Sequence, residues 1–127
     1  MQKVRGKNTR PELIIRHLLQ QLGYRGYRLH KKNIPGHPDI SWINRKLAIF
    51  INGCFWHGHH CSRGARIPKT NKEYWTAKIE RNHQRDLASQ TLLESYRWRP
   101  LTIWECELLD LDAVNQKLIN FFQSSEI

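Results

Sequence analysis

The sequence has no apolar run near the roughly 18 residues that a membrane-spanning helix requires, and no signal-peptide pattern at its start. It also has no basic amphipathic helix with one clean apolar face, which argues against a membrane surface as the partner. We therefore expect a soluble, intracellular protein that does not bind membranes.

Cysteine is scarce, since the chain has three cysteines, which cannot all pair with one another. This excludes a scaffold built on disulfides. With 127 residues the chain is long enough to bury a core without such bridges, and we expect one domain over residues 1–127. In a reducing compartment the cysteines then serve as metal ligands or as core residues.

Acidic residues are few as well, with 11 Asp and Glu against 21 Lys and Arg, which gives a net charge of +10. Such an excess of positive charge raises the local concentration of polyanions. Nucleic acid is therefore the first candidate for a partner.

Apolar spacing and turn residues predict a mixed order of helices and strands. A capping box formed by Thr9 and Glu12 opens a first helix, which ends at Gly23. The apolar positions of this helix are Leu13, Ile14, Leu18, Leu19 and Leu22. After it we expect a possible strand over 24–30 and then a hairpin of strands over 40–43 and 47–51. A long helix opened by a capping box at 70–73, a strand over 100–104 and a closing helix complete the chain.

These elements indicate an α/β fold with a mixed central sheet flanked by helices. The hairpin places Asp39 and Ile51 toward the same end of neighbouring strands. The long helix is expected to pack through an apolar stripe of Trp75, Ile79, Leu87 and Leu93, and the closing helix through Val114, Leu118, Phe121 and Phe122.

Residues 50–61 hold two of the three cysteines, three of the seven histidines and the pair Phe55-Trp56. This stretch follows the apolar run at 47–51, and metal-binding or catalytic side chains often lie where a rigid strand gives way to a loop. Thiolate and imidazole side chains favour zinc.

The candidate zinc ligands are Cys54, His59 and Cys61, and Cys106 follows a predicted strand that can return it to the cluster. Four such ligands leave no open position, which is typical of a structural zinc site. On spacing alone, His57 or His60 can replace His59, and three unrelated buried cysteines are the simpler alternative.

Carboxylates supply a second set of candidates. Asp39 follows a Pro-Gly-His-Pro turn at a strand start, where it suits Mg²⁺ beside a phosphate, although it can also serve only as a turn cap. Glu12 is most simply the capping-box partner of Thr9. Asp86 can form a solvated ion pair with a neighbouring arginine.

His57 is placed between the proposed zinc ligands and suits a base that activates water, or else a spare ligand or a surface histidine. Phe55 and Trp56 belong either to the core or to a loop rim, where aromatic side chains can wedge between bases.

The run 53–61, Gly-Cys-Phe-Trp-His-Gly-His-His-Cys, resembles the signature of the very-short-patch-repair (Vsr) mismatch endonucleases. Further matching motifs, in the family's order, are Lys7-Asn8-Thr9-x-x-Glu12, Pro35-Gly36-x-Pro38-Asp39, Lys78-Ile79-x-x-Asn82-x-x-Arg85-Asp86 and Trp104-Glu105-Cys106. The resemblance covers nearly the whole chain.

The resemblance implies a restriction-endonuclease-like core that uses Mg²⁺ to nick double-stranded DNA beside a T·G mismatch, with a structural zinc. It implies that Asp39 binds Mg²⁺ together with the Ile51 carbonyl, and that His57 is the base that activates water. Glu12 and Asp86 resemble the outer acidic residues of the family's site, where Asp86 orients His57. The zinc ligands it implies are Cys54, His59, Cys61 and Cys106, and the residues that wedge into the duplex are Met1, Phe55 and Trp56. Phosphate contacts are expected from Arg5, Lys7, Arg10, Arg63, Arg66, Lys69 and Lys72. A bacterial, cytoplasmic, nucleoid-associated monomer follows from the same resemblance.

The sequence departs from the family pattern in three places. Ile51 replaces a Thr, which is tolerable if that position acts through its carbonyl, and Asn52 replaces a His next to the metal. The chain also begins at the wedge residue Met1, so we expect part of the family's N-terminal DNA-clasping segment to be absent.

Two alternatives stay open from the sequence. A homing-type or mobile-element nuclease shares the same Glu-Asp-His-Asp set, and mismatch-dependent cleavage separates it from a repair enzyme. A zinc-stabilised DNA-binding module without activity predicts no Mg²⁺-dependent nicking.

Overall fold

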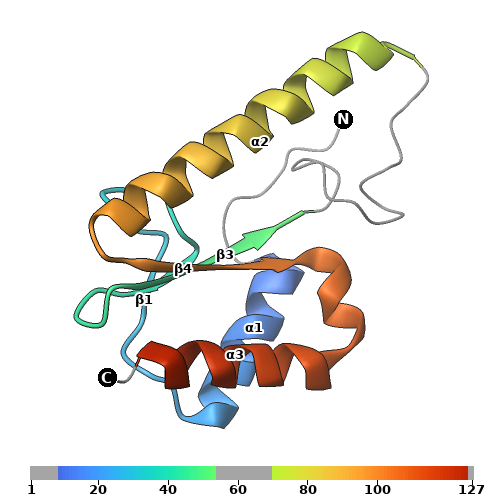
Figure 1. Cartoon of the computed structure of the whole chain (residues 1–127). Coiled ribbons are helices and arrows are strands. Elements are labelled where there is room, and N and C mark those ends of the chain that lie inside the picture. The colour runs from blue at the N-terminus through green and yellow to red at the C-terminus, as the bar shows by residue number, and fades with distance from the viewer. Residues whose placement is uncertain (1–8, 54–69, 126–127) are drawn as a thin grey trace.

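The computed structural model describes residues 9–53 and 70–125. A sheet of four strands lies between helices, with α2 on one face and α1 and α3 on the other (Figure 1). This confirms the predicted mixed sheet flanked by helices. No helix in the described part of the chain is long and apolar enough to cross a membrane.

Helix α1 (Arg10–Leu22) begins and ends where the sequence predicts. The Thr9 hydroxyl accepts a hydrogen bond from the Glu12 N–H at 3.4 Å, and Gly23 ends the helix with a φ of 82°. That left-handed conformation suits glycine, which has no Cβ. The predicted apolar side is largely confirmed, because Leu18 and Leu19 are buried and Ile14 and Leu22 pack against the core. One position differs, since Leu13 is 49% exposed and Ile15 is fully buried instead.

The sheet has the strand order β1-β2-β3-β4. The bounds are Arg28–Leu29 for β1, Ile40–Trp42 for β2, Leu47–Asn52 for β3 and Arg99–Trp104 for β4. The first three strands pair antiparallel, which confirms the predicted hairpin. The predicted first strand over 24–30 is reduced to the two residues of β1.

Strand β4 pairs parallel to β3, and the register places Asn52 beside Trp104 at the end of the ladder. The short 3₁₀ helix η1 (Glu105–Leu109) follows at once and contains Cys106. Glu107 and Lys117 brace this corner. The Lys117 ammonium donates to Glu107 at 2.8 Å and to the Thr102 carbonyl at 2.9 Å, and Glu107 accepts from the Trp104 N–H at 2.7 Å.

The core lies between the sheet and the pair α1–α3 (Figure 1). Helix α3 (Leu111–Ser125) buries all four of the predicted residues, Val114, Leu118, Phe121 and Phe122. The Phe122 ring stacks on Tyr24 at 3.8 Å between centroids and meets Trp42 edge-on at 4.7 Å. Offset or edge-on aromatic pairs of this kind add to the stabilisation from buried apolar area.

Helix α2 (Lys72–Ser95) crosses the opposite face of the sheet (Figure 1). Two predictions about it were wrong. Its N-cap is Asn71 in a left-handed conformation without a side-chain cap bond, so there is no capping box at 70–73. The apolar stripe is not a core stripe either, because Leu93 is buried but Leu87 is 49% exposed and Trp75 and Ile79 are half-buried.

Candidate active site

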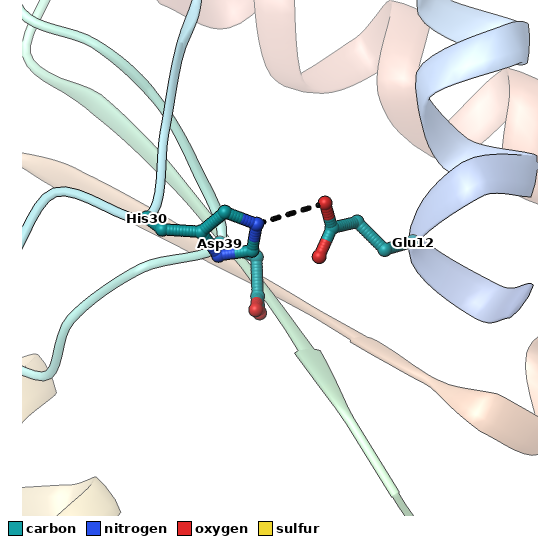
Figure 2. Close-up of side chains that lie close together, drawn as sticks. All are labelled: Glu12, His30 and Asp39. Carbon is teal, nitrogen blue, oxygen red and sulfur yellow. Dashed lines mark hydrogen bonds and ion pairs between the residues drawn. The ribbon is translucent and has the colours of Figure 1, made fainter. Parts of the chain in front are cut away.

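Three side chains from distant parts of the sequence meet at one end of the sheet (Figure 2). Glu12 comes from the first turn of α1, His30 follows β1, and Asp39 precedes β2. One potential ligand atom from each residue lies within 4.8 Å of the other two. This is the spacing of a site that can hold a single cation.

Asp39 is held by the backbone of the neighbouring strand. Its Oδ2 accepts a hydrogen bond from the Ile51 N–H at 2.8 Å, and its own N–H donates to the Ile49 carbonyl at 3.1 Å. The prediction that Asp39 and Ile51 lie at the same end of adjacent strands is therefore confirmed.

Glu12 is a buried carboxylate, 1% exposed. Its Oε2 lies 3.0 Å from His30 Nε2 and 3.5 Å from Arg16 Nη1. The capping interpretation holds for the Glu12 N–H, which bonds to Thr9, but it did not predict the contacts of the side chain with His30 and Arg16. Because an unpaired buried charge is very costly, these contacts make the burial of Glu12 possible.

Sequence reasoning missed His30 as a site residue. It lies next to Asp39 because the β1–β2 ladder pairs Leu29 with Ile40, and the His30 N–H donates to the Asp39 carbonyl at 3.1 Å. The signal was present in the sequence. An antiparallel pairing of the segment ending at His30 with the strand after Asp39 brings the two residues side by side.

Other predicted residues are described, but their roles stay predictions. Asp86 lies half-buried on α2, and Cys106 lies half-buried in η1. Arg10 is exposed at the start of α1, and Lys72 is exposed at the start of α2. Asn52, one of the departures from the family pattern, is 9% exposed at the end of β3.

The remaining predicted residues lie outside the described part of the chain. They are the base His57, the zinc ligands Cys54, His59 and Cys61, the wedge residues Met1, Phe55 and Trp56, and the basic residues Arg5, Lys7, Arg63, Arg66 and Lys69. Their roles also stay predictions.

Comparison with known proteins decides the family. A family model described as DNA mismatch endonuclease Vsr matches residues 1–63. The type II nicking enzyme V.XorIIP of Xanthomonas oryzae is 48% identical over 98% of this chain and 90% of its own length. The chain belongs to the Vsr family. It is a DNA endonuclease and therefore binds DNA.

Other Vsr relatives agree. The nicking enzyme V.NmeAIP of Neisseria meningitidis is 40% identical over 93% of this chain and 83% of its own length. The DNA mismatch endonuclease Vsr of Escherichia coli is 37% identical over 79% of this chain and 65% of its own length. The catalytic domain of the homing endonuclease I-Bth0305I superposes with a TM-score of 0.65 over 94% of this chain and all of that domain. At 23% identity that likeness establishes the fold alone.

Proposed function

We propose that this Vsr-family endonuclease nicks one strand of duplex DNA beside a T·G mismatch, using Mg²⁺ at Asp39. The names of two relatives support the parts of this proposal, since one is a mismatch endonuclease and the other a nicking enzyme. The observation that carries it is the meeting of Glu12, His30 and Asp39 at the end of β3, directly before the His57 segment.

The donor set fits a hard divalent cation. Two carboxylates offer oxygen ligands, which Mg²⁺ prefers, and one of them is almost fully buried. The N–H and carbonyl of one strand residue point to the same side, and the Ile51 N–H points at Asp39. The Ile51 carbonyl is therefore directed to the same edge, which supports its predicted role as a backbone ligand.

The chain's own residues divide the chemistry between them. When bound, Mg²⁺ neutralises negative charge on the scissile phosphate. Asp39 would hold the cation, and the buried Glu12 carboxylate would add a second negative charge at the same site. His57 takes the proton from the attacking water, and Asp86 on α2 orients the imidazole. Phe55, Trp56 and Met1 wedge into the stack beside the mismatch, where unstacking costs less than at a paired step.

A structural zinc fits the register of the sheet. The ladder pairs Asn52 with Trp104, and Cys54 and Cys106 each come two residues later in the sequence. We propose that Cys54, His59, Cys61 and Cys106 hold one zinc ion. Three thiolates and one imidazole form a closed tetrahedral set that suits zinc and leaves no position for catalysis.

Single-turnover nicking tests the proposal. Duplexes with one T·G mismatch, matched duplexes and single strands are incubated with Mg²⁺ and either the wild type or Asp39→Ala. We expect the wild type to nick only the mismatched duplex, and Asp39→Ala to bind it without nicking it. Equal nicking of matched DNA would leave an endonuclease but would overturn the mismatch role. Wild-type rates in Asp39→Ala would overturn the proposed Mg²⁺ site.

A further inference from the structure

His30 has an uncommon backbone conformation at the cation site. Its φ is 53°, in the left-handed region that few residues other than glycine adopt, although histidine is one of the more tolerant types. The imidazole faces the Glu12 carboxylate and lies close to Asp39 (Figure 2), and its side chain is 17% exposed. The backbone conformation and the bond to Glu12 together fix the ring at the site.

The spacing of the ring nitrogen suits a ligand. His30 Nε2 lies 3.0 Å from Glu12 Oε2. Two neighbouring ligands of an octahedral ion, each at about 2.1 Å from the metal, are about 3.0 Å apart. In one tautomer this nitrogen donates its proton to Glu12, and in the other it presents a lone pair to a cation. The Asp39 carboxylate is within reach of the same ion.

We propose that His30 supplies a nitrogen ligand to the divalent cation and thereby shifts the preference of the site from Mg²⁺ toward Mn²⁺. The inference rests on the proposed cation role of Asp39. Oxygen ligands suit both Mg²⁺ and Mn²⁺, but Mn²⁺ is a transition metal and gains more than Mg²⁺ from an imidazole nitrogen. A site with one nitrogen and two carboxylates therefore discriminates between the two ions through His30.

A simpler role for His30 predicts a different result. If the imidazole only holds Glu12 in place through the bond at 3.0 Å, its loss weakens all cations alike. If it is a ligand, its loss weakens Mn²⁺ more than Mg²⁺. The ratio of the two affinities, which a purely structural change does not move, therefore separates the two roles.

The experiment uses the full chain with its zinc content measured and unchanged throughout. Mn²⁺ binding is followed by electron paramagnetic resonance, and Mg²⁺ binding by competition against Mn²⁺. Mn²⁺ is the suitable probe because it has little affinity for the thiolates of the proposed zinc site. The variant is His30→Gln, which keeps a polar side chain that can bond to Glu12. The matched control is His83→Gln, on an exposed position of α2.

We expect His30→Gln to weaken Mn²⁺ binding at least about tenfold more than Mg²⁺ binding, and His83→Gln to change neither. Nitrogen coupling in the spin echo of bound Mn²⁺ should decrease in His30→Gln. Equal losses for both ions would overturn the inference and leave His30 as a positioning residue. A failure of the wild type to bind either ion would overturn both the inference and the proposed cation site. Mg²⁺-dependent nicking by the wild type, with the same ratio of Mn²⁺ to Mg²⁺ affinity in His30→Gln, would overturn the inference alone.

Discussion

At the scale of single residues, the part of the site formed by Glu12, His30 and Asp39 is held in position before any cation or DNA binds. Asp39 is fixed by the Ile51 N–H, and Glu12 is fixed by His30 and Arg16. A carboxylate that is already oriented loses little conformational freedom when it takes a ligand. We therefore expect the rate of nicking to depend more on the water-activating residues than on rearrangement of Glu12 and Asp39.

The first prediction concerns those residues. His57→Ala should lower the single-turnover rate by roughly 10²–10⁴-fold, the usual contribution of a positioned base. Asp86→Asn should lower the rate less, because it only orients the imidazole. Both variants should keep the wild-type zinc content and DNA affinity. A larger loss in Asp86→Asn than in His57→Ala would contradict this division of roles.

The residue scale also shows where the sequence misleads. The pattern Thr-x-x-Glu predicted a capping box, and the Thr9 cap is real. The same pattern does not show that the Glu12 side chain also contacts His30, 18 residues later. A local motif cannot show which distant residue contacts the same side chain, so the local interpretation of Glu12 was incomplete.

At the scale of the elements, the corner between β4 and η1 determines where Cys106 lies. Glu107 accepts from the Trp104 N–H and binds Lys117, so η1 is tied to both β4 and α3. This bracing fixes Cys106 relative to the end of the ladder with β3. A zinc site that includes Cys106 would join the β3 end to the β4 end of the sheet.

The second prediction follows from that corner. Cys106→Ser should lower the zinc content and the melting temperature together, because a structural zinc contributes its binding free energy to folding. Metal analysis and thermal unfolding measure the two quantities. Leu109→Ser, at an 81% exposed position of the same 3₁₀ helix, should change neither. Full zinc content in Cys106→Ser would remove this cysteine from the ligand set.

The third prediction concerns Gly36, where the turn before β2 passes between the sheet and α2. A Cβ at this position would lie 2.9 Å from the Phe50 ring and 2.9 Å from the Ser89 Cβ, and its φ is 80°. Gly36→Ala should therefore destabilise the protein by about 2 kcal/mol or more through overpacking and backbone strain.

Gly26→Ala is the matched control for this prediction. Gly26 has a φ of 83°, but a Cβ added there would meet nothing within 4 Å, so its substitution should cost only the strain, about 1 kcal/mol. Urea unfolding of both variants isolates the packing contribution. Equal destabilisation by the two substitutions would mean that the turn at Gly36 moves aside freely.

The elements that the sequence predicted best are those whose apolar residues lie in the main core. Helices α1 and α3 and the β2–β3 hairpin follow their apolar spacing closely. Helix α2 does not, because it lies on the sheet face opposite the main core and keeps Leu87 and Leu92 about half exposed. Its apolar residues therefore do not mark a core face, and spacing alone could not show this.

At the scale of the whole molecule, the excess of 21 basic over 11 acidic residues governs the encounter with DNA. The fourth prediction is that affinity for duplex DNA falls steeply with salt. If about five phosphates are neutralised, a plot of log affinity against log salt should have a slope of roughly −4 to −5.

A variant makes this prediction sharper. Lys72→Ala, at an exposed position at the start of α2, should make the slope shallower by about one if this residue contacts a phosphate. Binding isotherms between low and physiological salt measure both slopes. A wild-type slope near zero would mean that the positive charge serves another partner.

The parallel pairing of β3 with β4 also bears on how the chain folds. The strands β1, β2 and β3 each pair with the strand next to them in the sequence, whereas the whole of α2 separates β3 from β4. Contacts between distant segments form late because closing a long loop costs entropy first. We therefore expect the antiparallel strands to belong to the folding nucleus, and β4 to dock afterwards.

The fifth prediction tests this order with two equal deletions of one methyl group. Ile40 in β2 and Ile103 in β4 are both fully buried. Ile40→Val should mainly slow refolding, and Ile103→Val should mainly accelerate unfolding, as stopped-flow measurements would show. The reverse pattern would place β4 in the nucleus. If the expected order holds, the edge of β3 that pairs with β4 stays unpaired until the rest of the chain has been synthesised. Nascent chains will then depend on prompt completion of synthesis to avoid aggregation through this edge.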